Sequence, residues 1–341
     1  MAAPSHLIVI GTSAGGIPAL VKLVTQLPAT LPAAVLVVQH FVPDSDGQEL
    51  VDLLASHTSL ICRLPVNGDL IQPGTLYLAP PDRHLLAKDG SSAHLLVNKG
   101  PHENHYRPAA DALFRSAAVA FGPGVIGIVL TGLLFDGTAG LEFIKRCGGV
   151  TIVQDPLEAE HPSMPASALR HVDIDFVVPL AIMGSLLDEI MRGVVPERKG
   201  EIPEDIRLES IITERVLGST EAVAQIGHQV PLSCPDCGGS LWQVNEGKIL
   251  RYRCHTGHAF TADTLLHDSQ LNMEESLWIA LRLMEERRNL LTGMANRQEA
   301  QYPVKQSQRL DQISTQINRL REFLLTDTDG SQDATVASPE S

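Results

Sequence analysis

Apolar segments alternate with amphipathic ones along the first part of the chain. Leu7–Ile10, Ala34–Gln39 and Val125–Leu130 are continuous apolar runs, which predict buried strands. Apolar residues three and four positions apart predict helices at Ile17–Gln26 and Gln48–Ser56. The same alternation continues to residue 192. It predicts an α/β fold with a doubly wound, mostly parallel sheet and right-handed crossovers.

The pattern changes between Leu60 and Val97. Short apolar pieces, separated by turns, lie at Leu76–Leu78, His84–Ala87 and His94–Val97. We expect them to form an antiparallel excursion from the sheet. The remaining predicted elements of this region are helices at Pro108–Phe121, Pro165–Arg170 and Leu180–Arg192, a helix that ends at Lys145, and strands at Val150–Val153 and Phe176–Val178.

The second half of the chain has a different organisation. Residues 193–231 are charged and irregular, which predicts a linker with one helix near Ile206–Val216. Residues 232–261 form a compact cysteine and histidine module that is similar to a zinc ribbon. Apolar positions three and four apart predict a helical pair at 262–325, and the small polar residues of 326–341 predict a disordered tail.

Charge and composition limit the classes of function. The chain of 341 residues carries a formal net charge of −14, which argues against nucleic-acid binding because phosphate contacts need a basic face. No apolar run approaches the roughly 18 residues of a membrane span. The first residues lack the features of an export signal. We therefore expect a cytoplasmic protein without membrane insertion.

A glycine-rich turn follows the first predicted strand. Gly11, Ser13 and Gly15 have the spacing of a nucleophile elbow, and Ser13 is expected at the carboxyl edge of the sheet and the positive end of a helix. A serine that merely caps the helix is the simpler alternative. A dinucleotide-binding loop is disfavoured, because Ser13 replaces the middle glycine and the next strand ends in His40 instead of an acidic residue.

Two further polar residues follow strands that should end at the same edge. His40 follows Ala34–Gln39, and Asp136 lies in the loop after Val125–Leu130. Each has an ordinary explanation alone, as a loop histidine or a helix cap. Together with Ser13 they form a complementary nucleophile, base and orienting acid on converging loops. Their order in the chain differs from that of the α/β-hydrolases.

These residues stand in motifs that resemble the catalytic domain of bacterial chemotaxis protein-glutamate methylesterases. The motifs are IGTSAGG around Ser13, VVQH ending at His40, YLAPPDRH at Tyr77–His84, NHYRPAAD at Asn104–Asp111, VLTGLLFDGTAG at Val129–Gly140, and Met164–Pro165. The resemblance implies that Ser13 is the nucleophile, His40 the base and Asp136 its orienting partner. It also implies that the amides of Ala14 and Leu133 form the oxyanion hole.

The reaction that the resemblance implies is hydrolysis of glutamate γ-methyl esters on a methylated receptor or another signalling protein. Deamidation of glutamine would use the same steps, and neither reaction requires a catalytic cofactor. His105 and Arg107 are candidate substrate contacts, because a base and a guanidinium suit a carboxylate-rich surface. Ordinary exposed residues ahead of a helix are the alternative for both.

The chain departs from the family pattern in two ways. Leu134 and Phe135 stand where the family usually has glycine and asparagine, which puts the shape of this loop in question. No receiver domain precedes the first strand, so we expect no phosphorylation switch in cis.

Three of the five cysteines cluster in the module. Cys234-x2-Cys237 followed by Cys254-x3-His258 predicts a closed, structural zinc site, with His255 as the alternative fourth ligand. A redox pair is disfavoured because no thioredoxin-like βαβ unit surrounds it, and chance clustering is the remaining alternative. Cys62 and Cys147 are isolated and expected in the core.

Two other functions compete with the esterase. A non-enzymatic adaptor would keep the fold and bind a regulatory partner, or a second copy of the chain, through the zinc module and the helices. The altered residues Leu134 and Phe135 favour it, and the intact set of Ser13, His40 and Asp136 argues against it. A hydrolase of small esters would act on soluble esters but not on a methylated protein.

Overall fold

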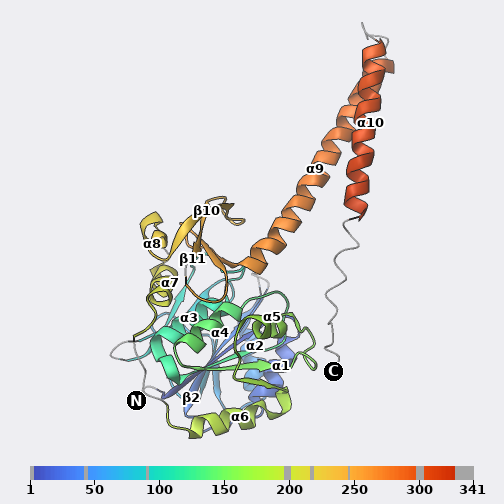
Figure 1. Ribbon diagram of the computed structural model, residues 1–341. Coiled ribbons are helices and arrows are strands. Elements are labelled where there is room, and N and C mark those ends of the chain that lie inside the picture. The colour runs from blue at the N-terminus through green and yellow to red at the C-terminus, as the bar shows by residue number, and fades with distance from the viewer. Residues whose placement is uncertain are drawn as a thin grey trace, which may run out of the picture. The chain divides into compact units, whose positions relative to one another are not determined.

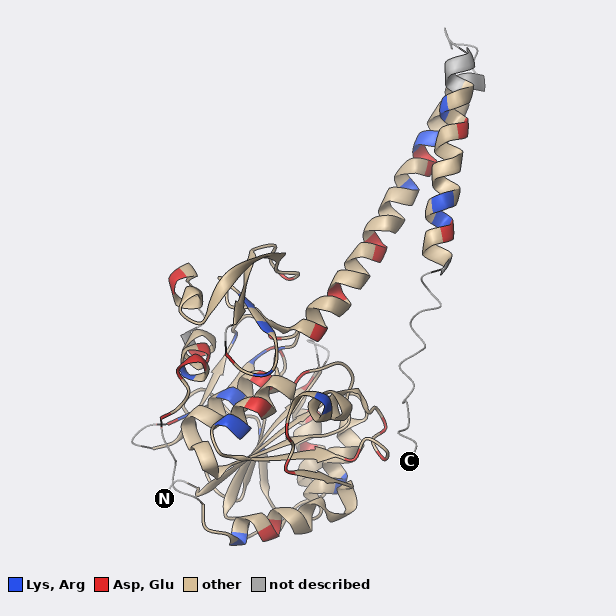
Figure 2. Ribbon diagram, viewed as in Figure 1, with Lys and Arg blue, Asp and Glu red and all other residues tan. Residues whose placement is uncertain are grey.

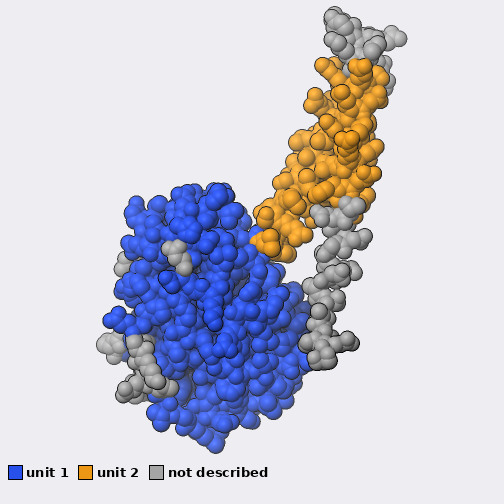
Figure 3. All heavy atoms as spheres, viewed as in Figure 1, with its two compact units in different colours: residues 1–265 blue, residues 266–341 orange. Residues whose placement is uncertain are grey.

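The computed structural model describes residues 4–41, 45–89, 92–195, 201–215, 219–244, 246–296 and 303–326. The chain divides into two compact units, residues 1–265 and 266–341 (Figure 3). All strands of the described chain lie in the first unit.

A seven-stranded parallel sheet forms the centre of the first unit (Figure 1). Its strands, in spatial order, are β3 (Ile61–Arg63), β4 (Thr75–Leu78), β2 (Ala33–Gln39), β1 (His6–Thr12), β7 (Val125–Val129), β8 (Val150–Gln154) and β9 (Phe176–Val178). Every neighbouring pair is parallel. The prediction of a doubly wound parallel sheet is confirmed.

Helices pack on both faces of this sheet, and alternate residues of one strand face the two cores. Leu7 and Val9 of β1 belong to one apolar core, whereas Ile8 and Ile10 belong to the other. This double burial explains why the strand reads as a continuous apolar run. The first core includes residues of α3 (Ala110–Phe121), α4 (Thr138–Arg146) and α5 (Ser163–His171); the second includes residues of α1 (Gly16–Val24), α2 (Gly47–Ala55) and α6 (Leu180–Arg192).

The predicted antiparallel excursion is only partly correct. Leu76–Leu78 lies in β4, which pairs in parallel with β2 inside the main sheet. Only β5 (His84–Lys88) and β6 (His94–Asn98) form an antiparallel hairpin. A short apolar run carries no information about strand direction, and β4 is buried on both faces like its parallel neighbours.

The segment expected to be a linker contributes to a second sheet. Its elements are α7 (Glu204–Arg215), where a helix was predicted, α8 (Thr220–Ala224) and β10 (Gly227–Ser233). β10 starts an antiparallel sheet that continues with β11 (Ser240–Val244), β12 (Arg251–Cys254) and β13 (Ala259–Thr261). Most residues of β10 are exposed, so the strand has no apolar pattern by which the sequence could reveal it.

The C-terminal helices are α9 (Ala262–Asn296) and α10 (Pro303–Thr326). Leu281 of α9 and Ile313, Ile317 and Leu324 of α10 form a small apolar cluster within the second unit. Acidic and basic residues are spread along the described parts of both helices (Figure 2). The predicted disordered tail lies outside the described residues after Thr326, which ends α10.

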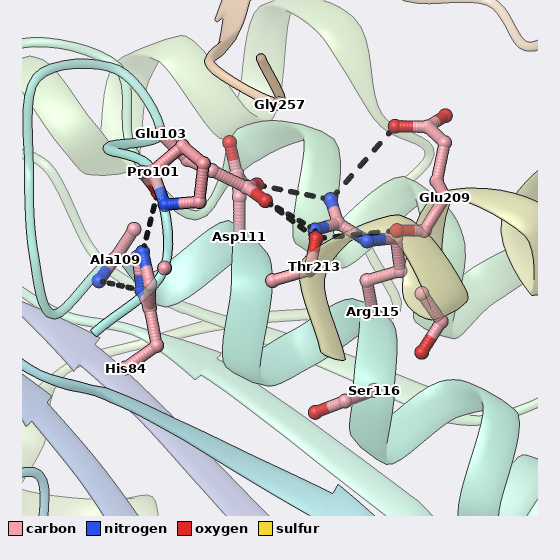
Figure 4. A network of polar contacts seen from close by, with 12 residues as sticks. His84, Pro101, Glu103, Ala109, Asp111, Arg115, Ser116, Glu209, Thr213 and Gly257 are labelled. Atoms are coloured by element: carbon pink, nitrogen blue, oxygen red, sulfur yellow. Dashed lines mark hydrogen bonds and ion pairs between the residues drawn. The ribbon is translucent and has the colours of Figure 1, made fainter. Parts of the chain in front are cut away.

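Buried ion pairs join α7 and the second sheet to α3. Figure 4 shows the part of this network around Arg115, Glu103 and Glu209. Arg115 of α3 places Nη1 3.0 Å from Oε2 of Glu103. Nη2 of Arg253, in β12, lies 3.3 Å from Oε1 of Glu103 and 3.3 Å from Oε2 of Glu209, in α7. Burial alone would raise the pKa of Glu103, but the two arginine charges outweigh it and hold that pKa well below its usual range. A network of buried ion pairs therefore connects the second sheet to the main domain.

Replacing Arg253 should destabilise the fold strongly. Arg253→Met keeps most of the side-chain volume but leaves Glu103 and Glu209 with less compensating charge, so we expect the free energy of unfolding to fall by about 3 kcal/mol. Urea denaturation of the full chain measures this. Arg192→Met, which removes an exposed pair with Asp188 on α6, should cost less than about 1 kcal/mol. Equal losses in both variants would contradict a special role for the buried network.

Candidate active site

Ser13 lies in the turn between β1 and α1. Its amide donates a hydrogen bond to the carbonyl of Thr131, in the loop after β7, at 3.1 Å. Gly15 has a φ of 71°, and a Cβ there would lie 2.9 Å from a carboxylate oxygen of Glu160. The left-handed backbone of this turn therefore favours glycine. The serine is held at the carboxyl edge of the sheet, as the sequence predicted.

His40 follows β2 and faces a buried carboxylate. Its Nε2 lies 2.7 Å from Oδ2 of Asp136, and the two side chains are 4% and 0% exposed. The amide of His40 donates to the carbonyl of Thr12 at 3.1 Å. Gln39 reaches across with Nε2, donating to the carbonyls of Ser13 at 2.9 Å and His40 at 3.0 Å. One amide side chain thus ties the loops of the predicted nucleophile and base together.

Asp136 rests on the N-terminus of α3. Its Oδ2 accepts the amide hydrogen of Ala110 at 2.6 Å, and its Oδ1 accepts that of Asp111 at 3.1 Å. These two amides hold the side chain of Asp136 against the start of the helix. The relation is reciprocal, because Oδ1 of Asp111 accepts the amides of Gly137 at 2.9 Å and Gly140 at 2.6 Å around the start of α4. Burial and the Asp136 charge raise the pKa of Asp111.

The three predicted residues meet at one sheet edge, but their contacts are unequal. His40 and Asp136 are hydrogen-bonded, whereas no hydrogen bond joins Ser13 to His40 in the part of the chain that the structure describes. Nδ1 of His40 is buried and has no hydrogen-bond partner there. Since Nε2 serves Asp136, Nδ1 is the nitrogen that is left to act as a base.

The predicted oxyanion donors belong to two loops, one that holds Ser13 and one that runs beside it. A Cβ on Gly132 would lie 2.9 Å from Cβ of Ser13, so the loop that carries Leu133 runs against the serine. Within the described residues, the amides of Ala14 and Leu133 have no hydrogen-bond acceptor. Neither amide is therefore engaged within the described residues, and their role as oxyanion donors stays a prediction.

Tyr106 is a neighbour of His40 that the sequence analysis missed. Its ring stacks on the imidazole with centroids 3.6 Å apart and planes inclined by 8°. Burial and the charge of Asp136 raise the pKa of its phenol. The residue stands inside the NHYRPAAD motif, but one aromatic residue before Arg–Pro has no spacing that would single it out.

His105 and Arg107 are not in this cluster of three residues. Nε of Arg107 donates to Oδ1 of Asp82 at 2.8 Å, and its Nη1 donates to the carbonyl of Gly100 at 2.7 Å. Nδ1 of His105 lies 2.7 Å from Oδ1 of Asp236, in the cysteine module. Each therefore has a protein partner, and contact of either with substrate stays a prediction.

The predicted metal ligands lie together in the second sheet. The sulfur atoms of Cys234, Cys237 and Cys254 and a ring nitrogen of His258 are all within 4.8 Å of one another. His258, not His255, completes the cluster. Thr256, which sequence reasoning missed, places its hydroxyl 2.8 Å from the sulfur of Cys254.

The distances within this cluster suit a tetrahedral ion. Nδ1 of His258 lies 3.6 Å from the sulfur of Cys234 and 3.5 Å from that of Cys254, and the sulfurs of Cys237 and Cys254 are 3.8 Å apart. Zinc bonds of usual length at tetrahedral angles separate sulfur from nitrogen by about 3.6 Å and sulfur from sulfur by about 3.8 Å.

The fold and the edge site together define an α/β protein in which a serine, a histidine and an aspartate converge at the carboxyl ends of parallel strands. Residues 8–187 match the CheB methylesterase family. This match covers more than half of the chain, and the chain belongs to that family. The resemblance found in its motifs is thereby confirmed, and the residues after 187 lie outside the match.

Individual relatives agree with this assignment. A protein-glutamate methylesterase/protein-glutamine glutaminase of Methanosarcina mazei is 37% identical over 196 residues, which are 55% of this chain and 52% of the relative. A putative enzyme of the same name from Leptospira interrogans is 35% identical over 191 residues, which are 56% of this chain and 97% of the relative. The chain therefore spans about half the length of the first relative.

A solved structure supports the same fold. The crystal structure of the Thermotoga maritima CheB methylesterase catalytic domain aligns with a TM-score of 0.53 and 32% sequence identity. The alignment covers 54% of this chain and 98% of that one.

In the loop before Asp136, Leu134 has a left-handed backbone conformation that glycine usually adopts. Leu134 has a φ of 65°, a conformation that costs an L residue roughly 1–2 kcal/mol. Leu134→Gly should relieve this strain. Because glycine also loses more chain entropy on folding, we expect a net gain in unfolding free energy of about 0.5 kcal/mol.

A helical leucine provides the control for this substitution. Leu169→Gly on the surface of α5 should lower the free energy of unfolding by about 1 kcal/mol. Urea denaturation compares the two variants. A loss at position 134 as large as that at position 169 would contradict the strain.

Proposed function

We propose that this chain hydrolyses glutamate γ-methyl esters on a methylated, chemoreceptor-like protein through an acyl-enzyme. The observation that carries the proposal is the buried hydrogen bond of 2.7 Å between Nε2 of His40 and Oδ2 of Asp136, at the sheet edge that presents Ser13. Membership of the CheB methylesterase family and the printed names of the relatives support it.

In the proposed mechanism, Nδ1 of His40 removes the proton of Ser13 as the serine oxygen attacks the γ-carbonyl carbon. The hydrogen bond to Asp136 keeps the imidazole proton on Nε2 and stabilises the imidazolium that forms. The amides of Ala14 and Leu133 hold the oxyanion, and losing one such donor typically costs about 3 kcal/mol of barrier.

The methoxide leaving group takes the proton from His40 and departs as methanol. His40 then removes a proton from a water molecule, which attacks the carbonyl carbon of the acyl-enzyme. As the bond to the serine oxygen breaks, His40 returns this proton to that oxygen, which releases glutamate and free Ser13. The same two steps would deamidate glutamine, with ammonia as the leaving group. None of these steps requires a cofactor.

The proposed site of action is the cytoplasm, where the substrate glutamates of a receptor's signalling region would be accessible. None of the described helices is long and apolar enough to cross a membrane. A regulatory partner or self-association through α9 and α10 stays a prediction, as does contact of His105 or Arg107 with the protein substrate.

Serine-directed labelling tests the proposal most directly. A fluorophosphonate probe should label the wild-type chain once, at Ser13, and Ser13→Ala should abolish both labelling and hydrolysis of a soluble ester. His40→Ala should lower kcat by at least about 10²-fold, because it removes the general base. Ser56→Ala, at the end of α2, should label like the wild type.

Circular dichroism verifies that these variants keep the fold. Unchanged turnover in Ser13→Ala would end the esterase proposal and favour the adaptor. Activity on soluble esters without demethylation of a methylated receptor would favour a hydrolase of small esters.

We further propose that Cys234, Cys237, Cys254 and His258 hold a structural zinc ion. The distances among their ligand atoms support this, and the closed set of four ligands leaves no open position for a reacting water. When bound, the ion would supply cross-linking of the second sheet, not chemistry.

Metal analysis of the purified chain tests the zinc proposal. We expect one zinc per chain in the wild type and in Cys62→Ser, whose cysteine lies away from the cluster, and a large loss of zinc in Cys254→Ser. Chelation should also lower the thermal unfolding temperature, because bound metal stabilises only the folded chain. A wild-type protein without zinc would contradict the proposal.

A further inference from the structure

One short segment of the first unit touches both the cysteine module and the active site. This segment, residues 101–109, leads into α3, and His84 holds both of its ends (Figure 4). Nδ1 of His84 accepts the amide hydrogen of Ala109 at 3.3 Å, and Nε2 donates to the carbonyl of Pro101 at 2.8 Å. Burial lowers the pKa of His84, in agreement with the neutral ring that these two bonds need.

A tight turn lies in the middle of the segment. Glu103 and Tyr106 exchange two backbone hydrogen bonds, at 3.2 and 2.9 Å, and the two residues between them adopt left-handed φ angles of 49° and 67°. The buried carboxylate of Glu103 is bound by Arg115 of α3 and Arg253 of β12. The turn is therefore clamped between the main domain and the second sheet.

Asn104 connects this turn to β13 and to the start of α9. Its amide donates to the carbonyl of Ala259 at 2.8 Å. Its Oδ1 accepts from the amide of Thr261 at 3.0 Å and from the hydroxyl of Thr264 at 3.1 Å. On its other side, Nδ2 donates to Oδ2 of Asp111 at 2.8 Å. The side chain is only 4% exposed, so these bonds form away from water.

Asp111 links Asn104 to Asp136, the proposed catalytic carboxylate. Its amide donates to Oδ1 of Asp136, and its side chain accepts the amides of Gly137 and Gly140. An unbroken chain of hydrogen bonds therefore runs from β13 through Asn104 and Asp111 to Asp136.

The next two residues of the turn make a second connection. Nδ1 of His105 lies 2.7 Å from Oδ1 of Asp236, which is located between Cys234 and Cys237. Its ring also packs against Phe260 of β13, with centroids 5.3 Å apart. Tyr106, directly after it, covers the imidazole of His40. Consecutive residues of one rigid turn thus contact the proposed zinc knuckle and the proposed base.

We propose that Asn104 and Tyr106 are positioning residues of the esterase, and that the metal-loaded cysteine module fixes their geometry over His40 and Asp136. The stacked ring of Tyr106 sets the plane of the imidazole and thereby the direction of Nδ1. The bonds of Asn104 hold the helix start on which Asp136 rests. This inference depends on the proposed esterase function, and it makes the second sheet a part of the hydrolase instead of a separate binding module.

Substitutions at Tyr106 test the stacking contact. Tyr106→Leu removes the aromatic plane but stays apolar, and we expect kcat for a soluble ester to fall by about tenfold or more while KM changes little. Tyr106→Phe retains the plane and should recover most of the lost kcat. Equal kcat values in the leucine and phenylalanine variants would overturn the role of the ring.

Substitutions at Asn104 and Thr264 test the hydrogen-bonded connection. Asn104→Ala breaks both sides of the connection and should lower kcat by about tenfold or more. Thr264→Val removes the hydroxyl that bonds Oδ1 of Asn104 and the hydroxyl of Thr261, but it leaves the bond from the Thr261 amide to Asn104, so it should lower kcat by a smaller factor. Wild-type kcat in both variants would overturn the proposal.

Metal removal tests whether the geometry around His40 depends on the metal-loaded cysteine module. Two readouts besides turnover are used. Zinc content is measured together with the imidazole NMR signals of His40, and with the labelling rate of Ser13 by the fluorophosphonate. Chelation, or Cys254→Ser, should shift the His40 signals and slow labelling by about tenfold. Cys62→Ser is the matched control and should keep the wild-type values.

The outcomes separate this inference from the function on which it depends. No labelling of the wild-type chain would refute the esterase itself. Labelling of the wild type that continues at full rate, with unchanged His40 signals, after zinc is lost would refute the coupling and leave the esterase intact. If zinc loss unfolds the chain, Asn104→Ala and Thr264→Val decide the question with the metal still bound.

Discussion

The structure depends on one carboxylate that has been withdrawn from water and placed on a helix N-terminus. Asp136 is fully buried, and its charge is balanced by two amides of α3 and by the imidazole of His40. A buried carboxylate without such partners would be protonated or very costly. The helix start, the loop after β7 and the imidazole must therefore be placed together, and any change in one of them disturbs the others.

Asp111 extends this constraint to a second helix. It accepts amides at the start of α4, while its own amide serves Asp136, so the N-termini of α3 and α4 each depend on a carboxylate from the other. The proximity of two buried acids has an electrostatic cost, which appears as the raised pKa of Asp111.

Buried charges join the second sheet to this centre, beside the backbone hydrogen bond of Asn104 to Ala259 and the apolar contact of Ile249 with the main core. Two arginines and two glutamates form ion pairs in the interior, so that each buried charge has a partner of opposite sign: Arg115, Arg253, Glu103 and Glu209. Such networks are demanding in geometry, because one missing partner leaves an uncompensated charge. They define a single docked position for the module, which an apolar contact of the same size would define less sharply. Because Glu103 belongs to this network, the network also positions the turn at Glu103–Tyr106. The ring of Tyr106, at the end of that turn, stacks on His40.

The sequence by itself determined the parallel sheet, the edge on which Ser13, His40 and Asp136 gather, and the cysteine and histidine cluster. These follow from local patterns: apolar runs of strand length, a glycine turn, residues directly after strands, and ligand spacing. Only the tertiary structure decided the direction of β4, the strand in the expected linker, the stacking of Tyr106 and the partners of His105 and Arg107. Each of these depends on contacts between residues far apart in the chain, and neither composition nor periodicity records which distant residue a buried polar group will meet.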